Sequence, residues 1–302
     1  MRTVIVGAGA MGSLFGALLT EAGVEVLLYD IAEEQVNAIN NHGLIIERDN
    51  RRRVIKIKAT TQVSHLGIAD LLIIFVKSYD TMTAIEEVKP CIRSHTQVLT
   101  LQNGEGNIEA IIKAVPSRQV LAGVTSHGAM LISPGIIRHN GGAKTFIGSV
   151  GKMEGSSVEA VAQLLNQGGI ETVVCEDIKQ AIWTKLIANA AINPLTAITG
   201  CCNGELLDEE NLFVLMRNIV EEGKNVANAQ KIRLFQDDMF DYVKSVCLAT
   251  KKNKSSMLMD ILKGRRTEID AINGRIVLIG RKSNVNVPVN QCVTLLVQYM
   301  EK

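Results

Sequence analysis

The chain has 302 residues, of which 47% are hydrophobic and 21% charged, and its formal net charge is +1. This length allows two ordinary domains. The balance is typical of a globular enzyme and lacks the basic surface that nucleic acids or anionic membranes require. No stretch approaches the roughly 18 uninterrupted apolar residues of a membrane span. The sequence therefore argues against a membrane protein and against a nucleic-acid-binding protein.

The cysteines and the N-terminus indicate the compartment. None of the six cysteines forms a C-x-x-C pair, and no Cys/His cluster has the spacing of a zinc site. The N-terminus enters a strand at once and has no apolar segment followed by a small-residue cleavage site. We therefore expect reduced thiols, no metal and a cytoplasmic location. The sequence leaves the oligomeric state open, with a homodimer as one alternative.

The first half of the chain alternates between short apolar runs and helix-like segments. Continuous apolar runs interleaved with helices predict a parallel sheet covered on both faces. The expected strands are Thr3–Val6, Val24–Tyr29, Leu71–Val76 and Gln97–Leu101. An added hairpin is expected from Leu44–Glu47 and Val54–Lys58, with Arg51 to Arg53 in its solvated turn.

After Asp177 strand signals nearly vanish and helical patterns dominate. The expected helices are Ile178–Ala197, Leu212–Ala229, Gln236–Lys252, Ile269–Lys282 and Val289–Met300. We therefore predict an α/β chain with a Rossmann-type parallel-sheet domain over residues 1–175. An all-α domain follows over residues 176–302.

A glycine-rich turn follows the first strand and opens a helix. Its sequence is Gly7-Ala8-Gly9-Ala10-Met11-Gly12, a G-x-G-x-x-G. The first glycine permits the tight turn, the second lets the backbone approach a pyrophosphate, and the third lets the helix pack on the strand. The N–H groups of the helix N-terminus are suited to phosphate oxygens. The motif predicts a dinucleotide site.

Two further polar residues directly follow expected parallel strands. Lys77 comes after Phe75-Val76, and Asn103 comes after Leu101-Gln102. Ligands bind at the carboxyl ends of such strands, so both side chains are expected to face the cofactor. The alternatives are a solvated lysine and an ordinary Asn-Gly turn.

A polar stripe crosses an otherwise apolar helix. Lys185, Asn189 and Asn193 are each four residues apart, and four residues advance a helix by roughly 40° beyond a full turn. The stripe is either a polar seam or the wall of a cleft. Downstream, Ser255 or Ser256 can cap a helix, and Glu268 can be ordinary surface charge.

Several blocks together resemble the ketopantoate reductase family, also called 2-dehydropantoate 2-reductases. They are GAGAMG, QNG, WTKLIANAAINPLTAITGCCNGEL, SSMLMDI and RRTEIDAING, and they span nearly the whole chain in order. The resemblance implies a Rossmann domain followed by an all-α domain similar to the C-terminal domain of 6-phosphogluconate dehydrogenase. It places the active site between the two.

The resemblance also implies the reaction and the role of each residue. Hydride passes from NADPH or NADH to the ketone of 2-dehydropantoate, a 2-keto acid, giving (R)-pantoate on the pathway to coenzyme A. Lys185 is then the catalytic proton donor, and Glu268 orients it or holds the nicotinamide ribose. The implied substrate-binding residues are Asn103, Lys185, Asn189, Asn193, Asn203, Asn253 and Ser256. With the glycine motif, the cofactor-binding residues are Gly7, Ala8, Gly9, Ala10, Met11, Gly12, Asp30, Lys77, Asn103, Ala129 and Glu268.

Asp30 sets this chain apart from the family's usual pattern. The family places an arginine after the second strand for the 2′-phosphate of NADPH, whereas here the strand ends in Asp30 and Ile31 follows. A carboxylate at this position accepts hydrogen bonds from a ribose 2′-hydroxyl and repels a 2′-phosphate. We therefore predict a preference for NADH.

Three alternatives remain. A D-2-hydroxyacid dehydrogenase of the same family, acting on branched or aromatic 2-keto acids, fits the same motifs. A non-catalytic nucleotide sensor fits the Rossmann half alone. Within the enzyme, His127 in TSHGA is a rival proton donor, because histidine is the commonest acid–base residue.

Overall fold

The computed structural model describes residues 1–151 and 156–302, which form two compact units. One unit contains residues 1–102 and 107–178 and is called here the sheet unit. The other contains residues 103–106 and 179–302 and is called the helical unit. The loop at residues 103–106 therefore groups with the helices, although a strand of the sheet unit ends shortly before it, at Thr100.

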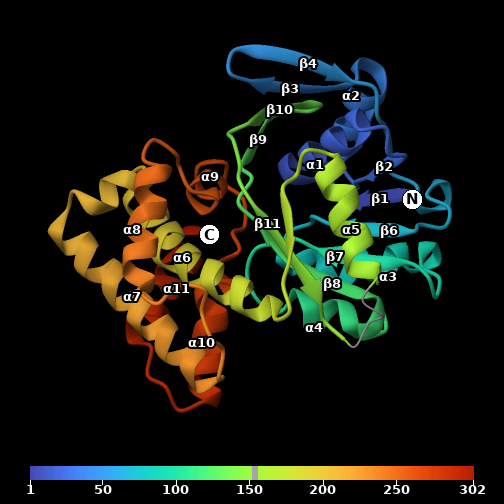
Figure 1. Cartoon of the computed structure of the whole chain (residues 1–302). Helices are drawn as coiled ribbons and strands as arrows, with labels where there is room; N and C mark the ends of the chain where they lie inside the picture. Colours follow the sequence, from blue (N-terminus) through green and yellow to red (C-terminus); the bar gives the residue numbers. More distant parts are fainter. Residues whose placement is uncertain (152–155) are drawn as a thin grey trace. The chain divides into compact units, whose positions relative to one another are not determined.

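The sheet unit is built on an eight-stranded sheet (Figure 1). Its strands are β1 (Thr3–Val6), β2 (Val26–Tyr29), β5 (Lys58–Thr60), β6 (Leu71–Ile74), β7 (Gln97–Thr100), β8 (Val120–Thr125), β11 (Thr145–Ser149) and β12 (Thr172–Val174). Their spatial order is β12-β11-β8-β7-β6-β1-β2-β5. The six neighbouring strands β5, β2, β1, β6, β7 and β8 are all parallel. Their spatial sequence is the 3-2-1-4-5-6 order of the Rossmann fold. This confirms the predicted fold class, and one antiparallel pair, β8–β11, extends the sheet.

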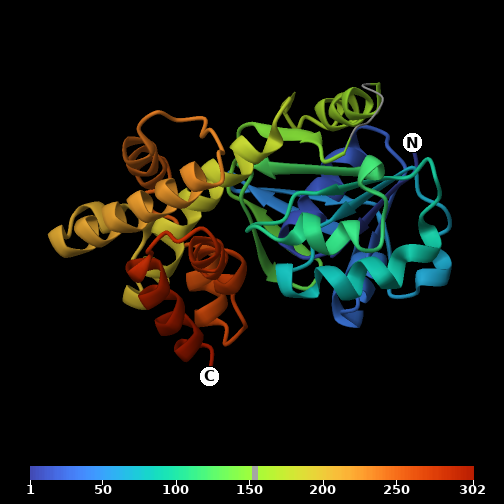
Figure 2. The same cartoon turned by 90° about the horizontal axis from the view of Figure 1, so that it is seen from below.

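Helices cover both faces of this sheet because both faces are apolar (Figures 1 and 2). Alternate residues of β1 point to opposite faces, so Ile5 packs in one buried cluster while Val4 and Val6 pack in the other. The helices of the unit are α1 (Ala10–Glu21), α2 (Glu33–His42), α3 (Thr81–Val88), α4 (Asn107–Ile112) and α5 (Ser156–Gln167).

A second sheet of four strands carries the predicted hairpin. It consists of β3 (Leu44–Arg48), β4 (Arg51–Ile55), β9 (Ala129–Ser133) and β10 (Ile136–His139), in the order β4-β3-β10-β9. The prediction that Arg51 to Arg53 form the turn is wrong, because all three lie in β4. The turn is Asp49-Asn50, with φ of 49° and 60°. Positive φ at both central positions is the pattern of a type I′ hairpin turn, and Asp and Asn tolerate it better than arginine.

The helical unit contains six helices within the described residues. They are α6 (Ile178–Thr199), α7 (Glu210–Ala229), α8 (Met239–Ala249), α9 (Ser256–Leu262), α10 (Asn273–Lys282) and α11 (Pro288–Met300), with 3₁₀ turns η5 (Asn203–Leu207) and η6 (Ile269–Ala271). One core joins them, and Ile187, Ile219, Val243 and Val297 in it are completely buried. The short helix α9 was not among the expected helices, although Ser255 was a predicted cap and is its N-cap.

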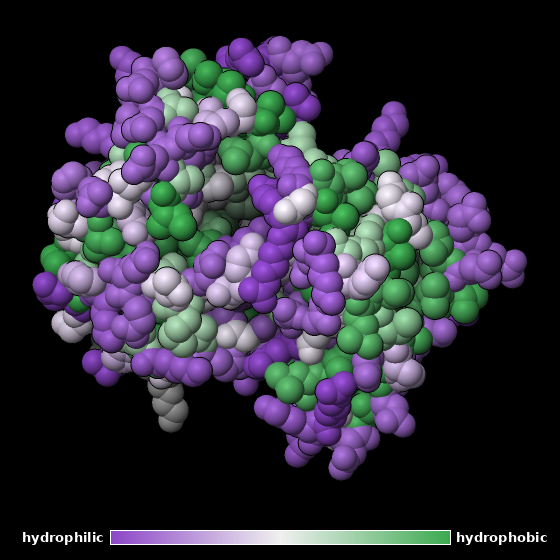
Figure 3. Space-filling model, turned by 180° about the vertical axis from the view of Figure 1, so that it is seen from behind, coloured by the Kyte–Doolittle hydropathy of each residue, from purple (hydrophilic) through white to green (hydrophobic). Residues whose placement is uncertain are grey.

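The surface mixes polar and apolar side chains. Figure 3 shows hydrophilic residues over much of one face, with hydrophobic patches between them. Folded proteins commonly keep more than half of their accessible surface apolar, so such patches are expected. None of the helices in the described ranges has the length and apolar composition to cross a lipid bilayer.

Candidate active site

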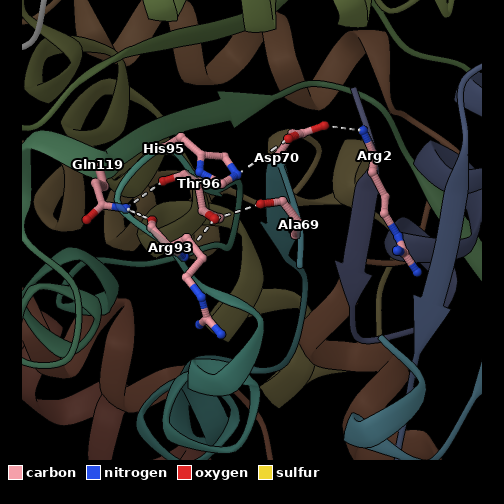
Figure 4. Close-up of polar contacts among 7 residues, drawn as sticks. All are labelled: Arg2, Ala69, Asp70, Arg93, His95, Thr96 and Gln119. Carbon is pink, nitrogen blue, oxygen red and sulfur yellow. Dashed lines mark hydrogen bonds and ion pairs between the residues drawn. The ribbon is translucent and has the colours of Figure 1, made fainter. Parts of the chain in front are cut away.

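At the amino ends of β1, β6, β7 and β8, polar groups of the protein bond to one another (Figure 4). The N–H of Arg2 donates to the carboxylate of Asp70 at 2.7 Å, and the hydroxyl of Thr96 donates to the carbonyl of Ala69 at 2.6 Å. The amide of Gln119 donates to the carbonyls of Arg93 and Thr96, at 2.6 and 2.8 Å. Ligands of such sheets bind at the opposite, carboxyl ends.

At the carboxyl end of β1 the glycine motif forms the predicted turn. Gly7 has a φ of 98°, and a Cβ there would lie 2.9 Å from the backbone of Phe75. A Cβ on Gly12 would lie 1.8 Å from the carbonyl oxygen of Gly7. The helix and the strand can approach this closely because glycine has no Cβ. A Cβ on Gly9 would meet nothing within 4 Å. The space at Gly9 is therefore open to a ligand.

The rest of the turn leads into α1. Gly9 is the N-cap of that helix and has no side-chain capping bond, so no capping side chain occupies the helix N-terminus. Ala8 is buried, whereas Ala10 and Met11 are half-buried. The arrangement suits a pyrophosphate, whose oxygens accept hydrogen bonds from backbone N–H groups at a helix N-terminus.

Asp30 lies at the end of β2, beside the glycine turn. Its carboxylate accepts the N–H of Ala8 at 2.6 Å and the N–H of Ala32 at 2.9 Å. Each carboxylate oxygen has further lone pairs, so the group can still accept a ribose hydroxyl. Ile31, the next residue, is 77% exposed and supplies no charge for a phosphate.

Gln102, which the sequence did not single out, joins the carboxyl ends of two strands. Its amide donates to the carbonyl of Val76 at 2.8 Å and to the hydroxyl of Thr81 at 2.7 Å. These bonds tie Gln102 to the residue before the half-buried Lys77 and to the first side chain of α3. The only sequence signal was its place in the QNG block.

Asn103 and Ala129 occupy different surroundings. Asn103 is half-buried and begins the loop that groups with the helical unit, where the N–H of Glu105 donates to Ala271 at 2.9 Å. Arg275 of α10 forms an ion pair with Glu105. Ala129 is the half-buried first residue of β9 in the sheet unit.

The polar stripe lies on one continuous helix, α6. Lys185 and Asn189 are half-buried and Asn193 is only 6% exposed, so the stripe is not an ordinary solvated face. Burial lowers the pKa of Lys185 from its usual 10.5 to about 8, against the upward effect of the Glu268 carboxylate. The two predicted catalytic residues are therefore electrostatically coupled, although they are far apart in sequence.

Contacts within the helical unit bring two of the other predicted substrate residues, Asn203 and Asn253, together. The backbone N–H of Asn203 donates to the carbonyl of Asn253 at 2.9 Å, and its side-chain amide donates to Thr250 at 2.9 Å. The Oδ1 atom of Asn203 is buried and has no hydrogen-bond partner in the described structure. A buried acceptor without a donor is costly, which makes this atom a candidate for a ligand hydroxyl.

Ser256 is held at the start of α9 by its neighbour. Ser255 accepts the N–H of Leu258 at 3.1 Å and also the hydroxyl of Thr196, on α6, at 2.7 Å. Ser255 is therefore the structural cap, while the side chain of Ser256 remains exposed. Of the two serines, Ser256 alone is placed to meet a ligand.

His127, the rival proton donor, is engaged elsewhere in the sheet unit. Its Nδ1 lies 3.3 Å from Nε2 of His139, and the two rings stack with centroids 5.5 Å apart. Phe15 of α1 packs edge-on against the ring of His127. Burial lowers the pKa of both histidines, so both are neutral at ordinary pH. This arrangement favours Lys185 over His127 as proton donor.

The comparisons with known proteins cover both units. The family model described as "Ketopantoate reductase PanE/ApbA" matches residues 3–152, and the model for the C-terminal part of that family matches residues 177–301. The 2-dehydropantoate 2-reductase of Pyrococcus horikoshii is 38% identical, over 100% of this chain and 98% of its own. That of Halobacterium salinarum is 34% identical, over 100% and 99%.

Two solved structures are similar to this chain over its whole length. A D-mandelate dehydrogenase in complex with NADH and anilino(oxo)acetate has a TM-score of 0.96 and 30% identity, and covers 100% of this chain and 98% of its own. A PanE/ApbA family ketopantoate reductase from Ralstonia eutropha has a TM-score of 0.91 and 32% identity, with the same coverage. These matches confirm the predicted fold class and the predicted enzyme class, a nicotinamide-dependent oxidoreductase. The chain belongs to the ketopantoate reductase family.

Proposed function

We propose that the chain is a 2-dehydropantoate 2-reductase that converts this 2-keto acid to (R)-pantoate. The observation that carries the proposal is the half-buried Lys185 on the polar face of α6, whose pKa the buried carboxylate of Glu268 raises against the effect of burial. A relative that is 38% identical over the full chain carries that name. The test is an absorbance assay of ketopantoate-dependent oxidation of each reduced cofactor.

The glycine turn fits the cofactor. Gly9 leaves open space where a pyrophosphate would lie, and the N-terminus of α1 offers N–H groups without a side-chain cap. Lys77, Asn103, Ala129 and Glu268 are the proposed contacts of the nicotinamide half. When bound, the reduced nicotinamide supplies the hydride.

Lys185 is proposed to act on the carbonyl oxygen. Negative charge grows on that oxygen as the ketone is reduced, and an ammonium stabilises the charge and donates the proton. Because the pKa of Lys185 is about 8, the ammonium is present at neutral pH and loses its proton readily. Glu268 favours the charged form.

The remaining polar groups are proposed to hold the substrate. Asn189 and Asn193 follow Lys185 along α6. Asn203 begins η5, Ser256 begins α9, and Asn253 lies in the segment just before α9. The unpartnered Oδ1 of Asn203 suits a donor such as the substrate hydroxyl. Neutral amides hold a carboxylate and a hydroxyl without neutralising the lysine. A site of this kind discriminates strongly against analogues that lack the hydroxyl.

A second candidate is a D-2-hydroxyacid dehydrogenase. The observation that favours it is the TM-score of 0.96 with a D-mandelate dehydrogenase. A substrate panel separates the two activities. Preference for 2-ketoisovalerate or phenylpyruvate over ketopantoate would overturn the first assignment, and no oxidation with any 2-keto acid would favour a nucleotide sensor.

NADH is the proposed cofactor. Asp30 faces the glycine turn, and the adjacent Ile31 is apolar and exposed. The structures of D-mandelate dehydrogenase that resemble this chain contain NADH. Steady-state kinetics with both cofactors test this choice.

A cytoplasmic location and a homodimer are further parts of the proposal. The six cysteines are all free thiols, as expected for a reducing compartment. Light scattering of the purified protein tests the dimer, and fractionation of cells tests the location.

A further inference from the structure

The helix α6 contains a break in its own hydrogen bonding in the middle of the polar stripe. Pro194 lies inside the helix, and a proline has no N–H to donate to the carbonyl four residues earlier. That carbonyl belongs to Ala190, which is completely buried, so water does not replace the missing donor. Ala190 lies between Asn189 and Asn193, the two proposed substrate amides on this helix.

The side chain of Asn273 supplies a donor to that carbonyl. Its Nδ2 donates to the oxygen of Ala190 at 3.0 Å, from the completely buried first residue of α10. The second amide proton is donated to Oδ1 of Asn290, also at 3.0 Å. Turning the amide over would bring its oxygen against two acceptor oxygens, so these contacts fix its orientation.

Asn290 is held in turn by Glu222 of α7. The amide of Asn290 donates to the Glu222 carboxylate at 2.8 Å, and the backbone N–H groups of Val289 and Asn290 donate to it at 2.9 Å each. A carboxylate at these N–H groups caps the first turn of α11. One chain of contacts therefore links α7, α11 and α10 to a single carbonyl of α6.

We propose that Asn273 is a positioning residue for the reduction described above, a proposal that rests on that proposed function. By bonding to Ala190 it holds the turn that Pro194 disrupts, and so keeps Asn189 and Asn193 in register with Lys185. The Oδ1 of Asn273 is buried without a partner in the described structure. That cost is consistent with an amide retained for its two N–H groups rather than for filling space.

The first experiment compares Asn273→Ala with Gln119→Ala. Both residues are buried amides that donate to backbone carbonyls, but Gln119 lies at the amino ends of the strands in the sheet unit. Both variants are expected to lower Tm. Asn273→Ala alone is expected to lower kcat/KM for the 2-keto acid by about 10- to 100-fold, mainly through KM, because misplacement of contacts by about 1 Å has effects of this size.

The dissociation constant of the reduced cofactor, measured by its fluorescence, is expected to stay unchanged in both variants. A purely structural role for Asn273 predicts that the two variants behave alike in kcat/KM. Equal kcat/KM values in Asn273→Ala and the wild type, or a parallel loss of cofactor binding, would overturn the proposal.

The second experiment restores the missing donor from the helix itself. Pro194→Ala supplies an N–H to the carbonyl of Ala190. It is expected to raise Tm by several degrees in the Asn273→Ala background, and to raise it less, or lower it, in the wild type. An equal effect in both backgrounds would show that Asn273 does not serve this carbonyl. The wild type, the two single variants and the double variant form a double-mutant cycle. The cycle also provides a folded double variant if Asn273→Ala alone does not fold.

If neither Asn273 variant folds, Asn290→Ala removes the support of Asn273 and leaves its bond to Ala190 in place. A several-fold loss of kcat/KM is expected there, and an unchanged value contradicts the proposal. A complete absence of 2-keto acid reduction is distinguishable from failure of this proposal, because it would already show in the wild type. The role in positioning would fall with it, while the Tm cycle would still report on the contact between Asn273 and Ala190.

Discussion

Burial lowers the pKa of the Lys185 ammonium and the carboxylate of Glu268 raises it, and the resulting value is about 8. The two residues are 83 positions apart in the sequence, and both belong to the helical unit. A lysine with this pKa is still charged at neutral pH and can exchange its proton near the working range of an enzyme.

Replacement of Lys185 by alanine is expected to lower kcat for 2-keto acid reduction by about 10²–10⁴, the usual effect of losing a general acid. Binding of the reduced cofactor, followed by fluorescence, is expected to change little. Lys282→Ala, at an exposed lysine of α10, is the matched control. Near-wild-type turnover in Lys185→Ala would remove this residue from the mechanism.

The pH dependence of reduction is expected to follow the ammonium of Lys185. Because the protonated form is the donor, kcat/KM for the 2-keto acid should fall as the pH rises through about 8. Glu268→Gln removes the charge that raises this pKa, so the falling limb should move to lower pH. Profiles of both proteins between pH 6 and about 10 test this, and an unshifted limb in the variant would contradict it.

The free energy of unfolding should rise with pH in the range where kcat/KM falls. The folded-state pKa of Lys185 is about 8 and the usual value is 10.5. Below pH 8 the lysine is charged in both states, and the folded state carries the full cost of burying the charge. Between these values the unfolded state binds more protons, so this cost is relieved as the pH rises. Lys185→Met should therefore stabilise the protein most below pH 8 and less near pH 10.5, as measured by denaturant unfolding.

Two glycines of the motif are expected to respond differently to a methyl group. Gly12→Ala places a Cβ 1.8 Å from the carbonyl oxygen of Gly7, so the variant should fold poorly or lose much of its stability. Gly9→Ala meets nothing within 4 Å, so its Tm should match the wild type. Its methyl group lies where a pyrophosphate would approach, and cofactor binding should weaken by about tenfold or more. Normal cofactor affinity in Gly9→Ala would argue against this binding site.

Cofactor choice is expected to depend on Asp30 and Ile31. Wild-type kcat/KM should be higher with NADH, and a value for NADPH ten times that for NADH would refute the preference. Asp30→Ala with Ile31→Arg should shift the preference toward NADPH, because a repulsion is removed and a phosphate partner added. Ile31→Arg alone is a useful intermediate, because it keeps the bonds of Asp30 to Ala8 and Ala32 and replaces a side chain that is 77% exposed.

Local patterns in the sequence were sufficient to predict much of the fold. The strand Thr3–Val6 has the predicted bounds, because a run of apolar residues before a glycine turn can be buried on both faces of a parallel sheet. The long helix α6 was predicted over nearly its full length, since its apolar residues favour burial and its internal proline did not end it. The position of Arg51 to Arg53 was not predicted, because the two left-handed residues before them set the turn.

The sequence by itself therefore determined the family, the fold class and the types of residue available for chemistry. These depend on local periodicity, on glycine geometry and on motif order, all of which are read along the chain. Only the tertiary structure decided that the Asp30 carboxylate accepts the N–H of Ala8 and that the Glu268 carboxylate raises the pKa of Lys185. It also decided that Asn273 donates to the carbonyl of Ala190. Each of these pairs is separated by 22 or more residues, and their meeting depends on how helices and strands pack, which no local pattern specifies.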